Sequence, residues 1–161
     1  MLGLFKKNKA VELLAPLTGK VLDISEVPDE VFSQKMVGDG LAIEPTEGVL
    51  LSPVEGTIKQ IFPTMHAVGI EAKSGVEILM HIGINTVELK GEGFKKFVET
   101  GAKVKPGDKL IEFDLDYIKE NATSIITPVL ITNMDAIKDF SVLADGQVVA
   151  GSDKILKAEM K

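Results

Sequence analysis

The rhythm of apolar runs and turn signals is the feature that most restricts the fold of this chain. From Glu12 onward, short apolar segments alternate about every 8–12 residues with turn signals rich in Gly, Pro, Asp and Asn. This spacing is typical of a β-sandwich or barrel, whereas βαβ units need longer helical patterns between the strands. We therefore expect an all-β protein with few and brief helices.

The same rhythm predicts the individual elements. Ten segments are expected to form strands: 19–24, 40–45, 48–52, 56–61, 67–72, 76–82, 86–89, 109–114, 129–132 and 146–149. Three segments carry helical signals: 93–99, 115–119 with Asp116 as an acid in the first turn, and 134–137 with Asn133 as the N-cap.

Two internal echoes accompany this pattern. Segment 15–21 resembles segment 52–58, because each places a proline three residues before a glycine that opens a strand. Segment 37–41 resembles segment 104–110, because each reads as a Gly-Asp turn that leads into a strand. The period is irregular, which argues against a solenoid and favours a folded-over β structure built from related hairpins.

Length and composition indicate one domain. The chain has 161 residues, 45% of them hydrophobic, which suffices for a single core. We assign residues 11–161 to this domain and residues 1–10 to a flexible N-terminal arm. The arm sets Leu2, Leu4 and Phe5 beside three lysines. It is either a frayed terminus or a weak contact with a membrane surface.

Charge and residue usage exclude several classes of function. The net charge is −6, with no Trp and one Tyr, so nucleic acid is not an expected partner. Because the chain has no cysteine, disulfides, thiolate zinc sites and cysteine nucleophiles are excluded. No apolar run approaches the roughly 20 residues that span a bilayer, so we expect a cytoplasmic protein.

The two histidines, His66 and His81, flank a hairpin whose turn signal is 73–75. A two-residue loop at 73–74 or at 74–75 sets His81 opposite His66 or one diagonal step away. Because side chains alternate along a strand, both rings then share one face, with Cβ atoms roughly 5 or 7–8 Å apart. Only a three-residue loop would place the rings on opposite faces. We therefore expect the pair to converge on one small ligand.

Three interpretations of such a pair remain open at this point. It is a structural pair, part of a zinc site that lacks further ligands, or a phosphoryl-transfer site. A neutral imidazole is a good nucleophile near pH 7, and a second ring can donate a hydrogen bond to phosphoryl oxygens. Thr64 lies two residues before His66, so its hydroxyl is a candidate to fix the tautomer of that ring.

Longer motifs give the chain a specific resemblance. They occupy segments 15–16, 27–32, 37–40, 61–67, 74–84, 86–94, 111–114 and 127–129. Together these residues strongly resemble the glucose-family enzyme IIA of the bacterial phosphoenolpyruvate-dependent sugar phosphotransferase system. The resemblance extends over nearly the whole chain. It implies an antiparallel β-sandwich of the barrel-sandwich hybrid type, with a duplicated hybrid motif and a few short helices.

The resemblance also implies roles for individual residues. His81 would be phosphorylated at Nε2 by the phosphocarrier HPr and would pass the group to a cysteine of a IIB domain during sugar uptake. His66 would stabilise the phosphoryl group, and Thr64 would orient His66. No cofactor would be required, although His66 and His81 would be able to bind zinc when a partner supplies a further ligand. Regulatory protein targets are also expected. The docking surface would include Asp29, Val31, Phe32, Met36, Val37, Phe62, Val68 and residue 85.

Residue 85 departs from the family pattern. The family usually carries Asp here, whereas this chain has Asn85, which keeps a hydrogen-bond acceptor and loses the charge. Three rival functions are also considered: a biotinyl or lipoyl carrier modified at Lys73, a metal-dependent enzyme built on the histidine pair, and a purely regulatory protein. The last is compatible with the carrier role, because phosphate on His81 would change the docking surface.

Overall fold

Strands dominate the computed structural model, which describes residues 9–161. The largest sheet has eight strands in the order β13 (Gly146–Val148), β2 (Gly19–Asp23), β3 (Asp39–Pro45), β11 (Thr127–Ile131), β7 (Glu77–His81), β6 (Ala67–Ala72), β5 (Gly56–Ile61) and β9 (Lys103–Val104). Each of its neighbouring strand pairs is antiparallel.

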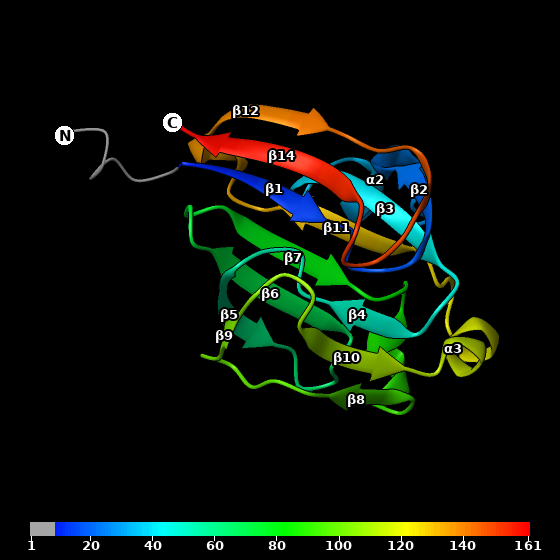
Figure 1. Cartoon of the computed structure of the whole chain (residues 1–161). Coiled ribbons are helices and arrows are strands. Elements are labelled where there is room, and N and C mark those ends of the chain that lie inside the picture. Colours follow the sequence, from blue (N-terminus) through cyan, green and yellow to red (C-terminus); the bar gives the residue numbers. More distant parts are fainter. Residues whose placement is uncertain (1–8) are drawn as a thin grey trace.

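Two three-stranded antiparallel sheets complete the β structure. One has the order β1 (Ala10–Leu14), β14 (Lys154–Met160) and β12 (Ile137–Val142). The other has the order β4 (Val49–Leu51), β10 (Lys109–Phe113) and β8 (Phe94–Lys96). In Figure 1, β12, β14 and β1 lie across the top, and β4, β10 and β8 lie in the lower half. The arrangement confirms the expected antiparallel β-sandwich.

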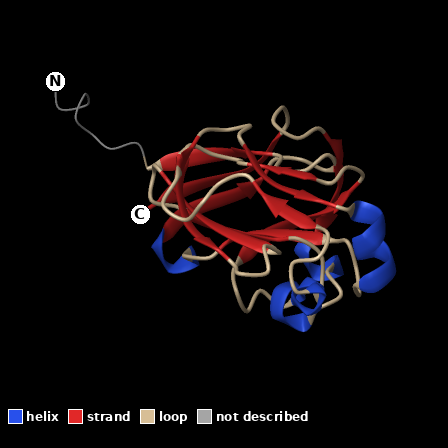
Figure 2. Ribbon diagram, turned by 90° about the horizontal axis from the view of Figure 1, so that it is seen from below, coloured by secondary structure: helices blue, strands red, loops and turns tan. Residues whose placement is uncertain are grey.

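The helices are short and lie at the periphery of the strands (Figure 2). They are η1 (Ile24–Glu26), α2 (Glu30–Ser33), η2 (Thr86–Leu89), α3 (Leu115–Asn121) and η3 (Met134–Ala136). The helix predicted at 115–119 is confirmed as α3, which begins after Asp114 because that carboxylate accepts a hydrogen bond from the amide of Tyr117.

Two predicted elements are wrong in type. Segment 93–99 contains strand β8, not a helix, because Phe94 is buried opposite Phe113 of β10 with the ring centroids 6.4 Å apart. Segment 86–89 forms the 3₁₀ helix η2, not a strand. Left-handed residues at both ends, Asn85 (φ 62°) and Lys90 (φ 54°), turn the chain away from an extended path.

Strands β1, β9, β12 and β14 were not expected from the sequence. β12 and β14 carry several charged residues, and β9 is only two residues long, so their apolar signal is weak. β1 includes Ala10, the last residue assigned to the arm, and pairs with β14 beside the C-terminus. The flexible-arm and membrane-contact hypotheses fall mainly on residues 1–8, which lie outside the described residues.

The core consists of aliphatic side chains from all three sheets. Leu13, Leu50, Ile58 and Ile78 are among its fully buried members. A second, smaller cluster lies beneath η1 and α2: it contains Ile24, Val27, Phe32, Ala42, Ile84 and Leu130. This smaller cluster attaches the η1–α2 segment to the main sheet, which determines where the residues of that segment lie.

Both internal echoes have a structural counterpart. Gly19 opens β2 and Gly56 opens β5, as the first echo predicted. A Cβ at Gly19 would lie 2.1 Å from the carbonyl oxygen of Glu44, and one at Gly56 would lie 2.3 Å from that of Glu71. Glycine is therefore needed where each strand approaches its neighbour most closely. In the second echo, the turns lead into β3 and β10.

Asn133 precedes η3 as predicted, but its side chain makes no helix-cap hydrogen bond. Its Oδ1 accepts from the amide of Glu77 at 2.9 Å, and its Nδ2 donates to the carbonyl of Gly75 at 3.0 Å. Asn133 thus ties the segment between β11 and η3 to the turn of the β6–β7 hairpin.

We predict that Asn133→Ala lowers the free energy of unfolding by about 1–3 kcal/mol, because two partly buried backbone groups lose their partner. Urea denaturation measures the change. Asn121→Ala is the matched control, since the Asn121 amide makes one exposed bond, to the carbonyl of Tyr117. Equal losses for the two variants would contradict a special role for Asn133.

Candidate functional site

The β6–β7 hairpin has a three-residue loop, so the expectation of a two-residue loop is wrong. The amide of Ala72 donates to the carbonyl of Val76 at 2.8 Å, and His81 pairs with Ala67 in the strand register. Gly75, with φ at +101°, supplies the left-handed residue that closes the three-residue turn. Within a regular ladder this register would separate the two histidines.

The two imidazoles nevertheless meet, as predicted. Their ring centroids lie 4.9 Å apart at an interplanar angle of 79°. His66 lies just before β6 and follows Met65, whose φ is +61°. The carbonyl of His66 still accepts a hydrogen bond from the amide of Ile82 at 2.7 Å. Strand alternation does not fix a side chain that lies outside the strand. The prediction of convergence is therefore confirmed, but by a route that the parity argument did not include.

The hydrogen bond of His81 assigns its tautomer. Its Nδ1 lies 2.7 Å from the carbonyl oxygen of Gly83. A carbonyl only accepts, so the proton of the neutral ring is on Nδ1 and the lone pair is on Nε2. His81 is thereby prepared to act as a nucleophile through Nε2. No residue pattern predicted this partner, because the interacting group belongs to the backbone.

Thr64 contacts His66 as expected from their spacing. The Oγ1 atom of Thr64 lies 2.5 Å from Nδ1 of His66. This contact leaves Nε2 as the remaining polar atom of the ring. Phe62 packs edge-on against the same ring with the centroids 5.5 Å apart, and His66 is 4% exposed. His66 is therefore held on two sides.

Burial keeps both imidazoles neutral. Desolvation is the main cause that lowers the pKa of His66 to about 4, and the neighbouring His81 lowers it further. Desolvation also lowers the pKa of His81, against smaller opposing effects of the Gly83 carbonyl and the Asp29 carboxylate. At neutral pH the pair consists of two uncharged rings, which is the form that a nitrogen nucleophile requires.

The residues proposed for docking divide into three groups. Val31 and Met36 are 42% and 70% exposed, so both apolar side chains are accessible to a partner. Val37, Phe62 and Asp29 are half-buried around the same segment or beside the histidines. Phe32 is buried, and its ring packs against His81 at 5.0 Å between centroids.

Val68 is the exception. It is 0% exposed and belongs to the main core, so the prediction that it lines a docking surface is wrong. Val68 lies on the same face of β6 as Ile70 and Ala72, and all three are buried.

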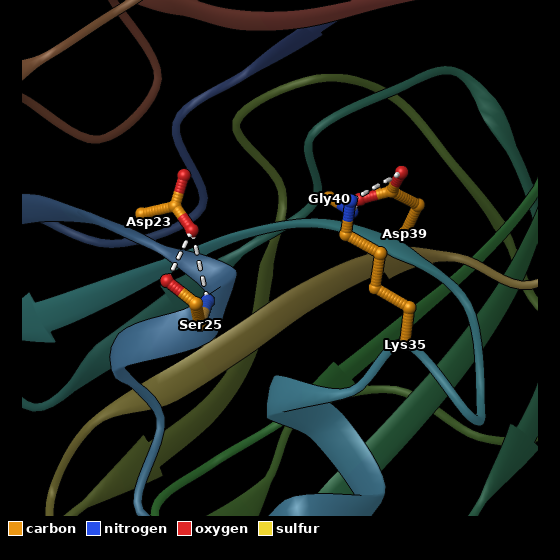
Figure 3. Close-up of polar contacts among 5 residues, drawn as sticks. All are labelled: Asp23, Ser25, Lys35, Asp39 and Gly40. Carbon is orange, nitrogen blue, oxygen red and sulfur yellow. Dashed lines mark hydrogen bonds and ion pairs between the residues drawn. The ribbon is translucent and has the colours of Figure 1, made fainter.

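Local polar contacts lie on either side of the segment that carries Asp29 to Val37 (Figure 3). At its start, Asp23 accepts hydrogen bonds from the amide and the hydroxyl of Ser25, at 2.9 and 2.6 Å, which lowers the pKa of that carboxyl. At its end, Asp39 accepts from the amide of Gly40 at 2.8 Å and lies 3.5 Å from the ammonium of Lys35. These contacts shape the turns on the two sides, whereas burial of Ile24, Val27 and Phe32 attaches the segment to the main sheet.

Asn85 has a local structural role besides its place on the rim. The residue is exposed and left-handed, a conformation that asparagine tolerates better than most residues. Its Nδ2 donates to the hydroxyl of Thr123 at 2.5 Å. Within residues 9–161 no hydrogen bond to its Oδ1 is found, so this oxygen is an uncharged acceptor on an exposed residue.

Within residues 9–161, no set of three His, Cys, Asp or Glu side chains is close enough to hold a metal ion. The same part of the chain contains no helix with the length and apolar character that crossing a membrane requires. The described residues therefore supply two imidazoles and no third metal ligand.

The fold and the site together define a β-sandwich protein with a paired-imidazole centre, in which one ring presents a free nucleophilic nitrogen. Residues 11–137 match the family described as phosphoenolpyruvate-dependent sugar phosphotransferase system, EIIA 1, and the chain belongs to that family. It is accordingly a phosphocarrier component of a sugar phosphotransferase system.

Individual relatives agree with this assignment. The PTS system glucose-specific EIIA component of Bacillus cereus is 51% identical over 161 residues, covering 100% of this chain and 98% of the relative. That of Staphylococcus epidermidis is 48% identical over 149 residues, covering 92% and 90%. The structure of glucose permease IIA from Mycoplasma capricolum has a TM-score of 0.87 and 41% identity, covering 95% of this chain and 98% of that one.

The pKa of His66 predicts a pH-dependent stability. Its folded pKa of about 4 lies below the unfolded value of ~6.5, so the unfolded state binds more protons. This contribution is fully present above the unfolded pKa and is lost as the pH falls through the folded one. The full shift corresponds to about 3 kcal/mol, and we expect about 1–3 kcal/mol after solvent screening.

Urea unfolding of the wild type and of His66→Gln between pH 7.5 and 4 measures this pH-dependent contribution of His66 to stability. We expect the stability of the wild type to fall more steeply with decreasing pH than that of the variant. Parallel curves would show that the folded state does not disfavour the protonated form of His66.

Proposed function

We propose that His81 is the phosphoryl acceptor of this phosphocarrier. Its Nε2 would receive the group from phospho-HPr and pass it to a cysteine of a IIB domain, which phosphorylates the incoming sugar. The observation that carries the proposal is the bond between Nδ1 of His81 and the carbonyl of Gly83, which leaves the lone pair on Nε2. The family assignment favours this function over a biotinyl or lipoyl carrier modified at Lys73.

In the transfer to His81 one N–P bond forms and another breaks, and the imidazole of His81 keeps its proton. The Nε2 lone pair of His81 forms an N–P bond while the phosphorus–nitrogen bond to the donor histidine of HPr breaks, and the bonding electrons return to that donor. The proton on Nδ1 remains, and the Gly83 carbonyl stabilises the positive charge that the ring gains. In the second transfer a thiolate forms an S–P bond, the N–P bond breaks, and Nε2 regains its lone pair.

His66 stabilises the transferred group in this mechanism. With the Thr64 hydroxyl donating to Nδ1, the proton of the neutral His66 ring is on Nε2. That N–H is available to donate to a phosphoryl oxygen on His81, because the ring centroids are 4.9 Å apart. A neutral donor supports the phosphoryl group without tying it in a strong ion pair, which suits a site that must release it.

The docking surface supports successive partners. Val31 and Met36 are exposed beside the site, and Val37 and Phe62 are half-buried next to them. We propose that HPr and the IIB domain use this same apolar surface, with basic residues of the partner near Asp29. Such exchange takes place on the cytoplasmic side, where HPr is charged by enzyme I. Regulatory targets and lipid contact through residues 1–10 stay predictions.

Zinc is proposed only for a complex. With Nδ1 of each ring engaged by Gly83 or Thr64, the two Nε2 atoms are the ligands that His66 and His81 have to offer. For His66 this requires the other tautomer, in which Nδ1 carries the proton and donates it to the Thr64 hydroxyl, so that Nε2 has its lone pair. Stable zinc sites take about four ligands, so a partner would have to supply a carboxylate and a further group.

Phosphorylation with enzyme I, HPr and phosphoenolpyruvate tests the assignment of the histidines. The wild type should gain one acid-labile phosphoryl group, and His81→Ala should gain none. His66→Ala should still accept the group but pass it to a IIB domain at least about tenfold more slowly, since the charge stabilisation is lost. A normally phosphorylated His81→Ala protein would refute the role of His81.

Asn85→Asp tests the electrostatics of the rim. We expect the variant to associate faster with HPr, by a few-fold at low salt, and to lose this gain as salt is raised, because an exposed ion pair is worth only ~0–1 kcal/mol. Stopped-flow association rates at two salt concentrations provide the measurement. An unchanged rate and an unchanged salt dependence would show that position 85 takes no part in docking.

A further inference from the structure

We propose that two buried threonines, Thr86 and Thr127, are positioning residues for His81, because they hold the peptide group that precedes the Cα of Gly83 and thereby restrict the direction of the Gly83 carbonyl that contacts Nδ1. The proposal rests on the proposed function for its catalytic meaning. Its structural content, the choice of tautomer, is independent of phosphoryl transfer.

The threonines hold one peptide group from both sides. Oγ1 of Thr86 donates to the carbonyl of Ile82 at 2.6 Å. On the other side of that peptide, the amide of Gly83 donates to Oγ1 of Thr127 at 3.2 Å. Both threonines are 0% exposed, so water does not replace either bond. The peptide between Ile82 and Gly83 therefore has a fixed plane.

The Thr127 hydroxyl is itself oriented. Its proton is donated to the carbonyl of Ile125 at 3.0 Å, which leaves a lone pair toward the amide of Gly83. Thr127 comes from β11, 44 positions after Gly83, whereas Thr86 lies only a turn away from Ile82. The Thr86 bond is of the kind that stabilises a local turn. The Thr127 bond instead links the site to the main sheet.

Gly83 needs such restraint. Its φ is +69°, and a Cβ there would lie 2.7 Å from the carbonyl oxygen of Ser124 and 2.8 Å from Cγ2 of Thr86. Glycine is thus required, yet glycine is the residue with the greatest backbone freedom. The following peptide is also fixed, because the amide of Ile84 donates to the carbonyl of Ser124 at 2.9 Å. The peptide groups before and after the Cα of Gly83 are therefore both held. The Gly83 carbonyl, which belongs to the second of them, has one direction, toward His81.

Loss of the Thr127 hydroxyl should release this arrangement. The buried amide of Gly83 would be left without a partner, which favours rotation of the peptide and weakens the bond between the Gly83 carbonyl and Nδ1. The Nε2–H tautomer of His81, which has no lone pair on Nε2, would then gain population. A merely structural threonine would lower stability without changing the tautomer ratio.

Nitrogen-15 NMR of the imidazoles in the free protein at pH 7.5 tests the proposal. In the wild type we expect His81 protonated on Nδ1. Thr127→Val should shift the tautomer ratio toward Nε2–H by about fivefold, the equivalent of one ordinary hydrogen bond. Thr127→Ser, which keeps the hydroxyl, should retain the ratio of the wild type. Thr132→Val is the matched control, since that hydroxyl contacts the carbonyl of Glu77 beyond the other end of β11.

Kinetics then link the tautomer to transfer. Thr127→Val should accept phosphate from phospho-HPr more slowly, in proportion to the fraction of the Nδ1–H tautomer that remains in the NMR measurement. The half-saturating HPr concentration should be unchanged, and Thr127→Ser should restore the rate. If Thr127→Val does not fold, Thr86→Val and Thr86→Ser carry the same NMR comparison.

An unshifted ratio in a folded Thr127→Val protein would overturn the proposal, and so would a wild type protonated on Nε2 of His81. Absence of phosphate on wild-type His81 would refute the proposed function while the NMR result still decided the role of the threonines.

Discussion

The hydrogen bond from Nδ1 of His81 to the carbonyl of Gly83 is the interaction on which the site depends. A neutral histidine can carry its proton on either ring nitrogen. This bond places the proton of His81 on Nδ1 and leaves the lone pair on Nε2. The bond exists because Gly83 adopts a left-handed conformation at the end of β7, which turns its carbonyl back over the preceding strand. The fold thus determines the chemistry through one backbone group, while the side chains around it maintain that group.

The imidazoles of the site are shielded from water, whereas apolar side chains in α2 and just after it are exposed. The imidazoles are withdrawn from water, which removes their charge, with Phe32 and Phe62 packed against the rings. A few residues away, Val31 and Met36 remain in water without an apolar neighbour to cover them. In the proposed function, a partner that covers these side chains would also bring its reactive group toward His81, because Phe32, the neighbour of Val31 in α2, packs against the His81 ring. Docking and chemistry would then be coupled.

Much of this could be predicted from the sequence, and the failures have identifiable causes. The turn rhythm correctly predicted an antiparallel β protein, and the spacing of Thr64 and His66 correctly predicted their contact. The loop of the β6–β7 hairpin was mispredicted because 73–75 permits several turns, and only the pairing of Ala67 with His81 decides among them. Val68 was misassigned because an apolar residue in a strand looks the same whether it is covered or not. The hydrogen bond between Gly83 and Thr127 was not predicted, because it joins residues 44 positions apart in the sequence.

The ends of the eight-stranded sheet have a consequence for association. Its outermost strands are β9, with two residues, and β13, with three. Exposed strand edges are templates for pairing with another chain, and shortening them removes most of the backbone groups that such pairing would use. Short outer strands suit a protein that exchanges partners at every turnover. At this sheet a complex would depend on side-chain contacts, because its short outer strands offer no continuous ladder that would hold a partner in place.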